Sequence, residues 1–172
     1  MNSSKKNILI GALLVAIIAM SIGYAAMAQQ LTISGSANFS DASWSINFTT
    51  ITLDATKTKG ATEVSAPSIV GTTASFDVKL AYPGAIAVYN IEVENAGSID
   101  AVLKTISGVT EANSAEPTGI KYTVDGIAAN DTLDASQKKQ FTVTVEWLDT
   151  DTIPTTNTSK TATIYLNYEQ AK

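Results

Sequence analysis

Apolar and polar residues alternate along most of the chain, and this period-two pattern predicts β-strands. Residues 74–103 contain three such runs, separated by two short turns. The apolar positions of the runs are Phe76, Val78 and Leu80, then Tyr89, Ile91 and Val93, then Ile99, Ala101 and Leu103. Alternation of this kind indicates an antiparallel sheet with one buried and one solvated face. Pro83 and Gly84 form the first turn, and in the second Gly97 can take a positive φ beside Asn95.

The same alternation predicts further short strands before and after this stretch. They fall in residues 29–39, 44–53, 63–70, 120–124, 141–147 and 162–168. The apolar parity changes at Thr49 and Thr50, which predicts a β-bulge, and Pro67 predicts a strand at a sheet edge. We expect residues 108–119 to form a loop, because they are too polar and too interrupted for a helix. The pattern therefore predicts an all-β fold, an antiparallel β-sandwich of the jelly-roll or immunoglobulin-like kind, as a single domain over 29–172.

Residues 1–28 have the character of an export signal. Lys5 and Lys6 precede an uncharged apolar run over residues 8–28 that ends in an A-x-A motif. The predicted cleavage-site residues are Ala26, Ala28 and Gln29. The same run is also long enough to serve as an uncleaved membrane anchor, and the lysines before it direct the remainder outside in either case. We therefore predict a secreted or cell-surface protein that contacts a membrane only through this segment, if the segment is uncleaved.

The composition excludes several classes of enzyme. The 172 residues include no cysteine and no histidine. Without them the chain cannot form a cysteine nucleophile, a serine–histidine triad or an HExxH zinc site. The net charge is −5 and the lysines form no basic stripe, which argues against nucleic-acid binding. We expect no enzymatic activity, no cofactor and no metal.

Two pairs of side chains have the chemistry of a ligand site, and for each a simpler interpretation is available. Asp149 and Asp151 carry carboxylates of the kind that bind calcium, but they lack EF-hand spacing. We expect a solvated acidic loop there. Trp44 and Trp147 have the shape of a sugar-binding platform, but both stand on the apolar parity of predicted strands. We expect them to pack in the core.

Several stretches resemble a known family. They are LTISGSANF (31–39), WSINF (44–48) and, after the Pro-Gly turn, IEVENAGSIDAVL (91–103). In layout, over most of the exported chain, they are similar to the TasA/camelysin-like surface proteins of Gram-positive bacteria. The resemblance implies a jelly-roll or sandwich at the cell surface. Some members of that family assemble into biofilm matrix fibres, in which the N-terminal strand of one subunit completes the sheet of the next. Camelysin is described as a metalloprotease, whereas this sequence lacks histidine, the commonest zinc ligand.

Residues 29–39 have the pattern of a strand that could pair with another subunit. Signal cleavage would free this segment, and its alternate positions are apolar. An added strand gains main-chain hydrogen bonds from a partner's open edge. In an isolated monomer we expect the strand to pair within its own sheet. Our leading hypothesis is a structural subunit of an extracellular fibre or biofilm matrix that self-associates through edge strands, with Leu31 and Ile33 as anchors. The alternative is a monomeric, membrane-tethered binding or adhesion module.

Overall fold

The computed structural model describes residues 3–27, 34–37, 41–149 and 159–171. The chain divides into two units, Met1–Ser40 and Asp41–Lys172. In the first unit α1 (Ser3–Met27) is a helix, and residues 34–37 belong to no helix or strand. Among the described residues, we find no helix with both the length and the apolar character needed to cross a membrane.

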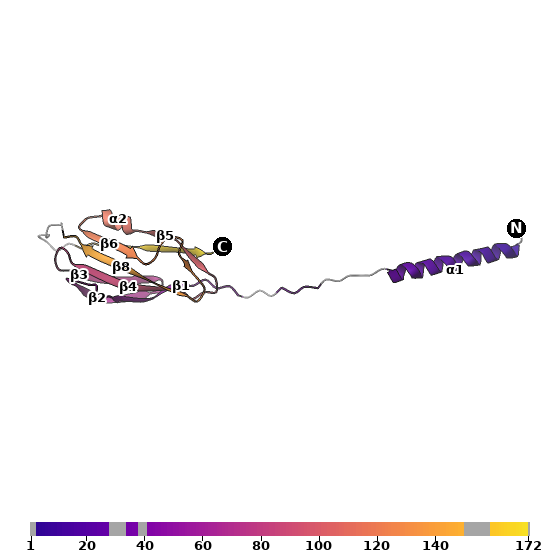
Figure 1. Cartoon of the computed structure of the whole chain (residues 1–172), viewed down its shortest axis with the longest axis horizontal. Coiled ribbons are helices and arrows are strands. Elements are labelled where there is room, and N and C mark those ends of the chain that lie inside the picture. Colours follow the sequence, from indigo (N-terminus) through magenta and orange to yellow (C-terminus); the bar gives the residue numbers. More distant parts are fainter. Residues whose placement is uncertain (1–2, 28–33, 38–40, 150–158, 172) are drawn as a thin grey trace. The chain divides into compact units, whose positions relative to one another are not determined.

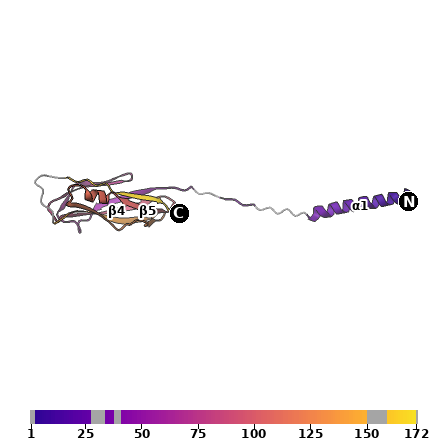
Figure 2. The ribbon, with the colours of Figure 1, turned by 90° about the horizontal axis from the view of Figure 1, so that it is seen from above.

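The second unit is built from antiparallel strands, as the alternation predicts (Figure 1). The strands are β1 (Ile46–Leu53), β2 (Ala61–Val70), β3 (Thr73–Leu80), β4 (Ile86–Asn95), β5 (Ala101–Ser107), β6 (Ile120–Asp125), β7 (Thr132–Leu133), β8 (Lys138–Trp147) and β9 (Tyr165–Gln170), and α2 (Val109–Ser114) is a short helix. They form three sheets with the strand orders β1-β4-β8-β6, β2-β3 and β7-β5-β9. Most strands run along the long direction of this unit, as a second view shows (Figure 2). The prediction of an all-β, antiparallel fold is confirmed.

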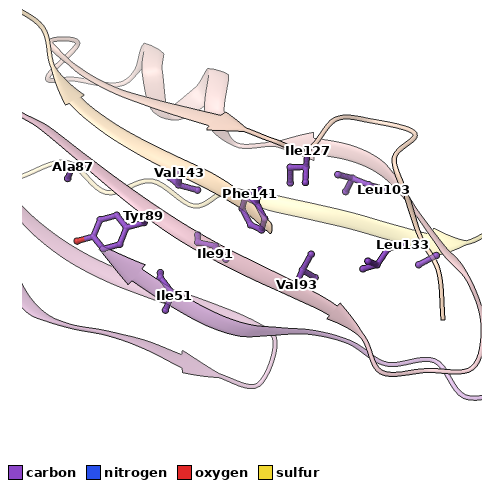
Figure 3. Packing of buried hydrophobic residues seen from close by; sticks show 11 residues of the cluster. Ile51, Ala87, Tyr89, Ile91, Val93, Leu103, Ile127, Leu133, Phe141 and Val143 are labelled. Atoms are coloured by element: carbon purple, nitrogen blue, oxygen red, sulfur yellow. The ribbon is translucent and has the colours of Figure 1, made fainter. Parts of the chain in front are cut away.

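Side chains from all three sheets share one core. The buried cluster consists of Ile51, Ala87, Tyr89, Ile91, Val93, Ala101, Leu103, Ile127, Leu133, Phe141 and Val143 (Figure 3). Partly buried side chains of the β2-β3 hairpin, among them Phe76, Val78 and Leu80, pack against it. Most of these residues occupy the apolar positions of the alternating runs. Burial of each large aliphatic or aromatic side chain contributes about 1.5–3 kcal/mol to stability, so the alternation itself selects the face that is buried.

Two predicted irregularities are present. The register of β1 against β4 shifts between Phe48 and Thr50, which is the expected bulge. In β2 the register against β3 shifts on both sides of Ser65. Pro67 lies in the second shifted region, between Ser65 and Ser68. It has no N–H to donate to a ladder, and it is tolerated here because β2 is the edge strand of a two-stranded sheet.

Residues 108–119 contain a helix, so the prediction of a loop was wrong. α2 follows Gly108, whose φ of 91° turns the chain out of β5. The helix buries Ala112, which is 7% exposed. A helix of this length is not stable alone, and α2 is held by hydrogen bonds between the side chain of Asn113 and the main chain of Tyr122. The signal that forms it is therefore tertiary, and periodicity within the segment does not reveal it.

Gly97 is required for close approach and does not use the positive φ that a glycine can take. Its φ lies outside the left-handed region. A Cβ at this position would lie against the carbonyl oxygen of Ser43 and 3.0 Å from the nitrogen of Ser45. The nitrogen of Ser98 donates to Ser43 O at 3.0 Å in the same place. The missing side chain lets the first residues of the second unit lie directly on the turn between β4 and β5.

Candidate assembly groove

The residues predicted to anchor a donated strand and to flank the cleavage site fall mostly outside the described part of the chain. Ala26 lies in the last turn of α1. The others, Ala28, Gln29, Leu31 and Ile33, lie outside the described residues, and the roles assigned to them stay predictions. Residues 34–37, the described part of the proposed donor, are exposed and form no strand. The described residues therefore belong mostly to the part of the chain that would accept a donated strand.

Two strand edges without a neighbour border the same part of the core. In the orders β2-β3 and β7-β5-β9, both β3 and β9 pair on one side only among the described strands. Phe76 and Leu80 of β3 pack against the small cluster of Ala112, Tyr122 and Val145. Ile164, immediately before β9, packs against the same cluster. The two edges therefore approach one apolar region without pairing with each other.

A cavity of ≈ 200 Å³ opens beside β9. We call it the assembly groove, and it is lined by Trp44, Ile46, Asn47, Phe48, Thr72, Val93, Leu166 and Tyr168. Its residues come from β1 and β4 on one side, from β9 on the other, and from the turn between β2 and β3. A dry cavity of about 150 Å³ accepts a benzene-sized molecule, so this groove has room for one or two aliphatic side chains.

Trp44 stands at the groove and is 45% exposed, so the prediction that it packs in the core was wrong. It lies two residues before β1, where the pleat no longer directs it fully inward. Trp147, at the end of β8, is half-buried. Trp44 therefore adds a partly open aromatic side chain to the apolar lining of the groove.

The groove side of β9 is apolar, and its main chain is regular. Leu166 and Tyr168 alternate with exposed residues and are themselves half-buried. The pKa of Tyr168 is raised, mainly by burial and secondly by the nearby carboxylate of Asp131. The register shift between β5 and β9 falls between Leu103 and Thr105, so the extra residue belongs to β5. An edge without proline or bulge is the kind that pairs readily with an added strand.

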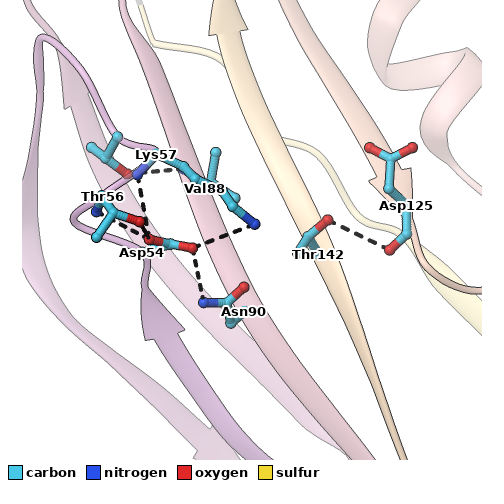
Figure 4. Close-up of polar contacts among 8 residues, drawn as sticks. Asp54, Thr56, Lys57, Val88, Asn90, Asp125 and Thr142 are labelled. Atoms are coloured by element: carbon cyan, nitrogen blue, oxygen red, sulfur yellow. Dashed lines mark hydrogen bonds and ion pairs between the residues drawn. The ribbon is translucent and has the colours of Figure 1, made fainter.

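The outward face of the four-stranded sheet is polar and holds its carboxylates in hydrogen bonds. Asp54 accepts from Thr56 Oγ1 at 2.6 Å and from Asn90 Nδ2 at 3.3 Å (Figure 4). The hydrogen bond from Thr56, with smaller ones from its neighbours, lowers the pKa of Asp54 to about 2 against the cost of desolvation. Glu92 accepts from Thr49 Oγ1 at 2.6 Å and from Lys138 Nζ at 2.9 Å.

These carboxylates are ionised at neutral pH. The hydrogen bond from Thr49, followed by that from Lys138, lowers the pKa of Glu92 to about 2. A general acid needs a raised pKa, so neither Asp54 nor Glu92 suits that role. In the part of the chain that the structure describes, no three acidic side chains gather in a way that could hold a metal ion.

Among the described residues, the groove and the sheet edges are therefore the features that point to a function. Sequence reasoning named the donor segment but not the acceptor, because the groove forms only where three sheets meet. The chain matches no protein-family model, no curated protein and no solved structure.

Proposed function

We propose that this protein is a non-enzymatic structural subunit of an extracellular fibre or biofilm matrix. In this proposal an extended segment of one subunit pairs with the β9 edge of the next. The domain is a β-sandwich, with β1-β4-β8-β6 as one layer and the β2-β3 and β7-β5-β9 sheets as the other. The core that all three sheets share supports this two-layer arrangement.

The observation that carries the proposal is an apolar groove beside an unpaired strand edge. Strand addition takes its affinity from main-chain hydrogen bonds and its specificity from alternate side chains that enter pockets. Leu31 and Ile33 are two residues apart, so in a strand they point to the same face. The groove of ≈ 200 Å³ suits these two side chains. Both partners of the interaction are therefore present in one sequence, as a self-assembling subunit requires.

Assembly also requires that the donor segment be free outside the cell, and export would provide this. Cleavage between Ala28 and Gln29 would release residues 29–39 outside the cell as a free N-terminal segment. Head-to-tail contacts of this kind are heterologous, and they generate open filaments when the rotation between subunits does not close a ring. The proposal thus rests on two features, an export-type leader and an apolar groove beside a strand edge.

The donor is tested by negative-stain electron microscopy of purified residues 29–172 at neutral pH. We expect filaments from the unaltered chain and none from the double variant Leu31→Lys/Ile33→Lys, because a lysine does not enter an apolar groove. The matched control is Thr32→Lys/Ser34→Lys, which adds the same two charges on the opposite parity and should leave filaments intact. Filaments that persist in the double variant would sink the donor assignment. Compact monomers from the unaltered chain, with the intact chain in the membrane fraction, would favour the tethered module.

The acceptor is tested by mixing. Leu166→Lys places a charge in the groove and leaves residues 29–39 unchanged, so this subunit can donate but cannot accept. Added in small proportion to the unaltered chain, it should cap growing ends and shorten the filaments. Glu169→Lys, on the exposed side of the same strand, is the control and should not shorten them. Circular dichroism of each variant establishes that its sheets are formed. Equal filament lengths with both variants would place the acceptor elsewhere.

A further inference from the structure

β6 ends the four-stranded sheet opposite β1, and its outer edge is bonded by side chains instead of by a strand. The nitrogen of Tyr122 donates to Asn113 Oδ1 at 2.7 Å, and Asn113 Nδ2 donates to the carbonyl oxygen of Tyr122 at 2.9 Å. A neighbouring strand makes the same pair of hydrogen bonds with one residue of an antiparallel edge. The amide of Asn113 therefore acts as a substitute for a strand's peptide groups.

Lys160 makes hydrogen bonds to the same edge of β6, two residues earlier, at Ile120. Its Nζ donates to the carbonyl oxygen of Ile120 at 2.8 Å, and to those of Ala115 and Pro117 at 2.9 Å each. An ammonium has three N–H donors, so all three are used. The hydroxyl of Tyr122 donates in turn to the carbonyl oxygen of Lys160 at 3.0 Å. Ile120 and Tyr122 alternate along β6, so the carbonyl groups that they direct outward lie on one edge.

The position of Asn113 is itself fixed. Lys121 Nζ donates to the carbonyl oxygen of Asn113 at 2.8 Å, and Ala112 of α2 is buried beside Tyr122. Without this support β6 would be a good pairing strand. Its residues Ile120, Tyr122 and Val124 are β-branched or aromatic, and it contains no proline or glycine. Native proteins protect such edges from pairing with other chains.

We propose that Asn113 and Lys160, which we call the edge cap, keep β6 from pairing with β6 of a second copy of this chain. Strand β6 is self-complementary: two copies of it can form an antiparallel pair about a two-fold axis. In a pair centred on Thr123, Tyr122 lies opposite Val124 of the other copy, and both present main-chain groups outward. Lys121 then faces Asp125 of the other copy, and opposite charges at facing positions stabilise a pair of strands.

Only the effect of this cap on filament growth rests on the proposed function. With β6 capped, a subunit that accepts a strand at its β9 edge cannot also pair through β6, so a filament does not branch at β6. The cap itself is a property of the monomer and is tested without filaments. The test therefore uses residues 29–172 with Leu31→Lys/Ile33→Lys as the background, in which the proposed donor is disabled.

The first variant is Asn113→Ala in that background, and its matched control is Ser114→Ala. The Ser114 hydroxyl donates to the carbonyl oxygen of Thr110 within α2 and does not contact β6. We expect a concentration-dependent dimer by sedimentation velocity for Asn113→Ala and a monomer for Ser114→Ala. At low concentration the amide of Tyr122 should exchange its hydrogen about tenfold faster than in the background chain, as expected for one lost hydrogen bond. At high concentration the dimer should restore its protection.

A second variant separates specific pairing from non-specific association. Asp125→Lys, added to Asn113→Ala, sets two lysines opposite each other and should raise the dissociation constant of the dimer about tenfold. A monomer at all concentrations, with Tyr122 exchanging rapidly, would overturn the proposal, because the edge would then be open yet unable to pair. A dimer insensitive to Asp125→Lys would also overturn it. If Asn113→Ala fails to fold, Lys160→Gln opens the Ile120 end of the same edge, with the same outcomes expected.

Discussion

The ring of Phe76 stacks on the ring of Tyr89, with centroids 4.2 Å apart and planes inclined by 24°. The stack joins the β2-β3 hairpin to the central strand β4, which has no ladder to β3. Tyr89 is 0% exposed, and its hydroxyl has no hydrogen-bond partner among the described residues. Burial, followed by the charges of Glu63 and Asp77, raises the pKa of Tyr89 to about 12. The ring contributes stability here, and the hydroxyl opposes it.

Tyr89→Phe should therefore raise the free energy of unfolding by about 1 kcal/mol. The replacement keeps the stack and removes a buried polar atom, whose desolvation costs about 1–3 kcal/mol when it is unsatisfied. Urea denaturation at neutral pH, followed by circular dichroism, measures the change. Tyr82→Phe is the control, because Tyr82 is 43% exposed and the same change there should be nearly neutral. A loss of stability in Tyr89→Phe would show that the hydroxyl has a partner.

Asn95→Ala should lower the free energy of unfolding by about 3 kcal/mol or more. The side chain is 0% exposed. Its Nδ2 donates to the carbonyl oxygens of Ile99 at 2.8 Å and Leu133 at 3.0 Å, and its Oδ1 accepts from the nitrogen of Gly97 at 3.0 Å. Truncation leaves these buried groups without partners, at about 1–3 kcal/mol for each group. The same urea titration measures it.

Asn90→Ala serves as the control for Asn95→Ala. Asn90 lies on the same strand but on the outward face, where it makes one hydrogen bond of 3.3 Å to Asp54. Its loss should cost less than about 1 kcal/mol, because water can replace the partner. Equal effects of the two variants would mean that the buried position of Asn95 adds nothing.

Gly97→Ala should destabilise the second unit by about 1–3 kcal/mol, the usual cost of overpacking a well-packed site. The new methyl group would press on the carbonyl oxygen of Ser43, which the nitrogen of Ser98 holds in place. Thermal unfolding of residues 29–172 measures the effect. Gly35→Ala is the control, since a Cβ there has no heavy atom within 4 Å. An unchanged midpoint for Gly97→Ala would mean that the segment at Ser43 can move away from the turn between β4 and β5 without loss of stability.

The stability of the chain should depend on pH through Glu92. Hydrogen bonds from Thr49 and Lys138 lower its pKa from 4.5 to about 2. The folded state therefore binds this proton less readily than the unfolded state does. The stabilisation is complete above pH 4.5 and is lost as the pH falls toward about 2.

Glu92→Gln removes this contribution. The variant should be less stable than the unaltered chain at pH 7, and the difference should narrow as the pH is lowered toward 2. Urea denaturation midpoints at pH 7, 4 and 2.5 measure it. Glu146→Gln, which removes an exposed carboxylate of β8 instead, is measured beside it as the matched control. A constant difference between Glu92→Gln and the unaltered chain across this range would contradict the assignment.

Much of the fold was predictable from alternation, because burial of one sheet face is a local property of each strand. Strands β3, β4 and β8 fall where their apolar residues predict, and the bulge near Thr49 follows from a change of parity. Strand β7 has only two residues, Thr132 and Leu133, which is too short for a period to be detected. Helix α2 depends on the contact between Asn113 and Tyr122, which the local sequence around neither residue predicts.

The candidate site was less predictable than the fold. The groove needs the order in which the sheets assemble, and hydrophobic periodicity does not encode that order. Trp44 has the parity of a core residue, yet it precedes β1 and remains partly open. Asn95 and Gly97 read as ordinary turn residues. Their importance lies in contacts with Leu133 and Ser43, which are distant in sequence.

The contact between Ser43 and Ser98 also decides how the domain would carry tension. Ser43 N donates to Ser98 Oγ at 2.9 Å, and the chain then continues into β1, which pairs antiparallel with β4. A pull applied at residue 41 along the axis of β1 loads the hydrogen bonds to β4 in shear, so that many must yield together. The same pull at right angles to β1 would peel them apart one by one, beginning at Ser43. Gly97 thus sits at the mechanical clamp of the domain, and its replacement should lower the force needed to unfold the second unit.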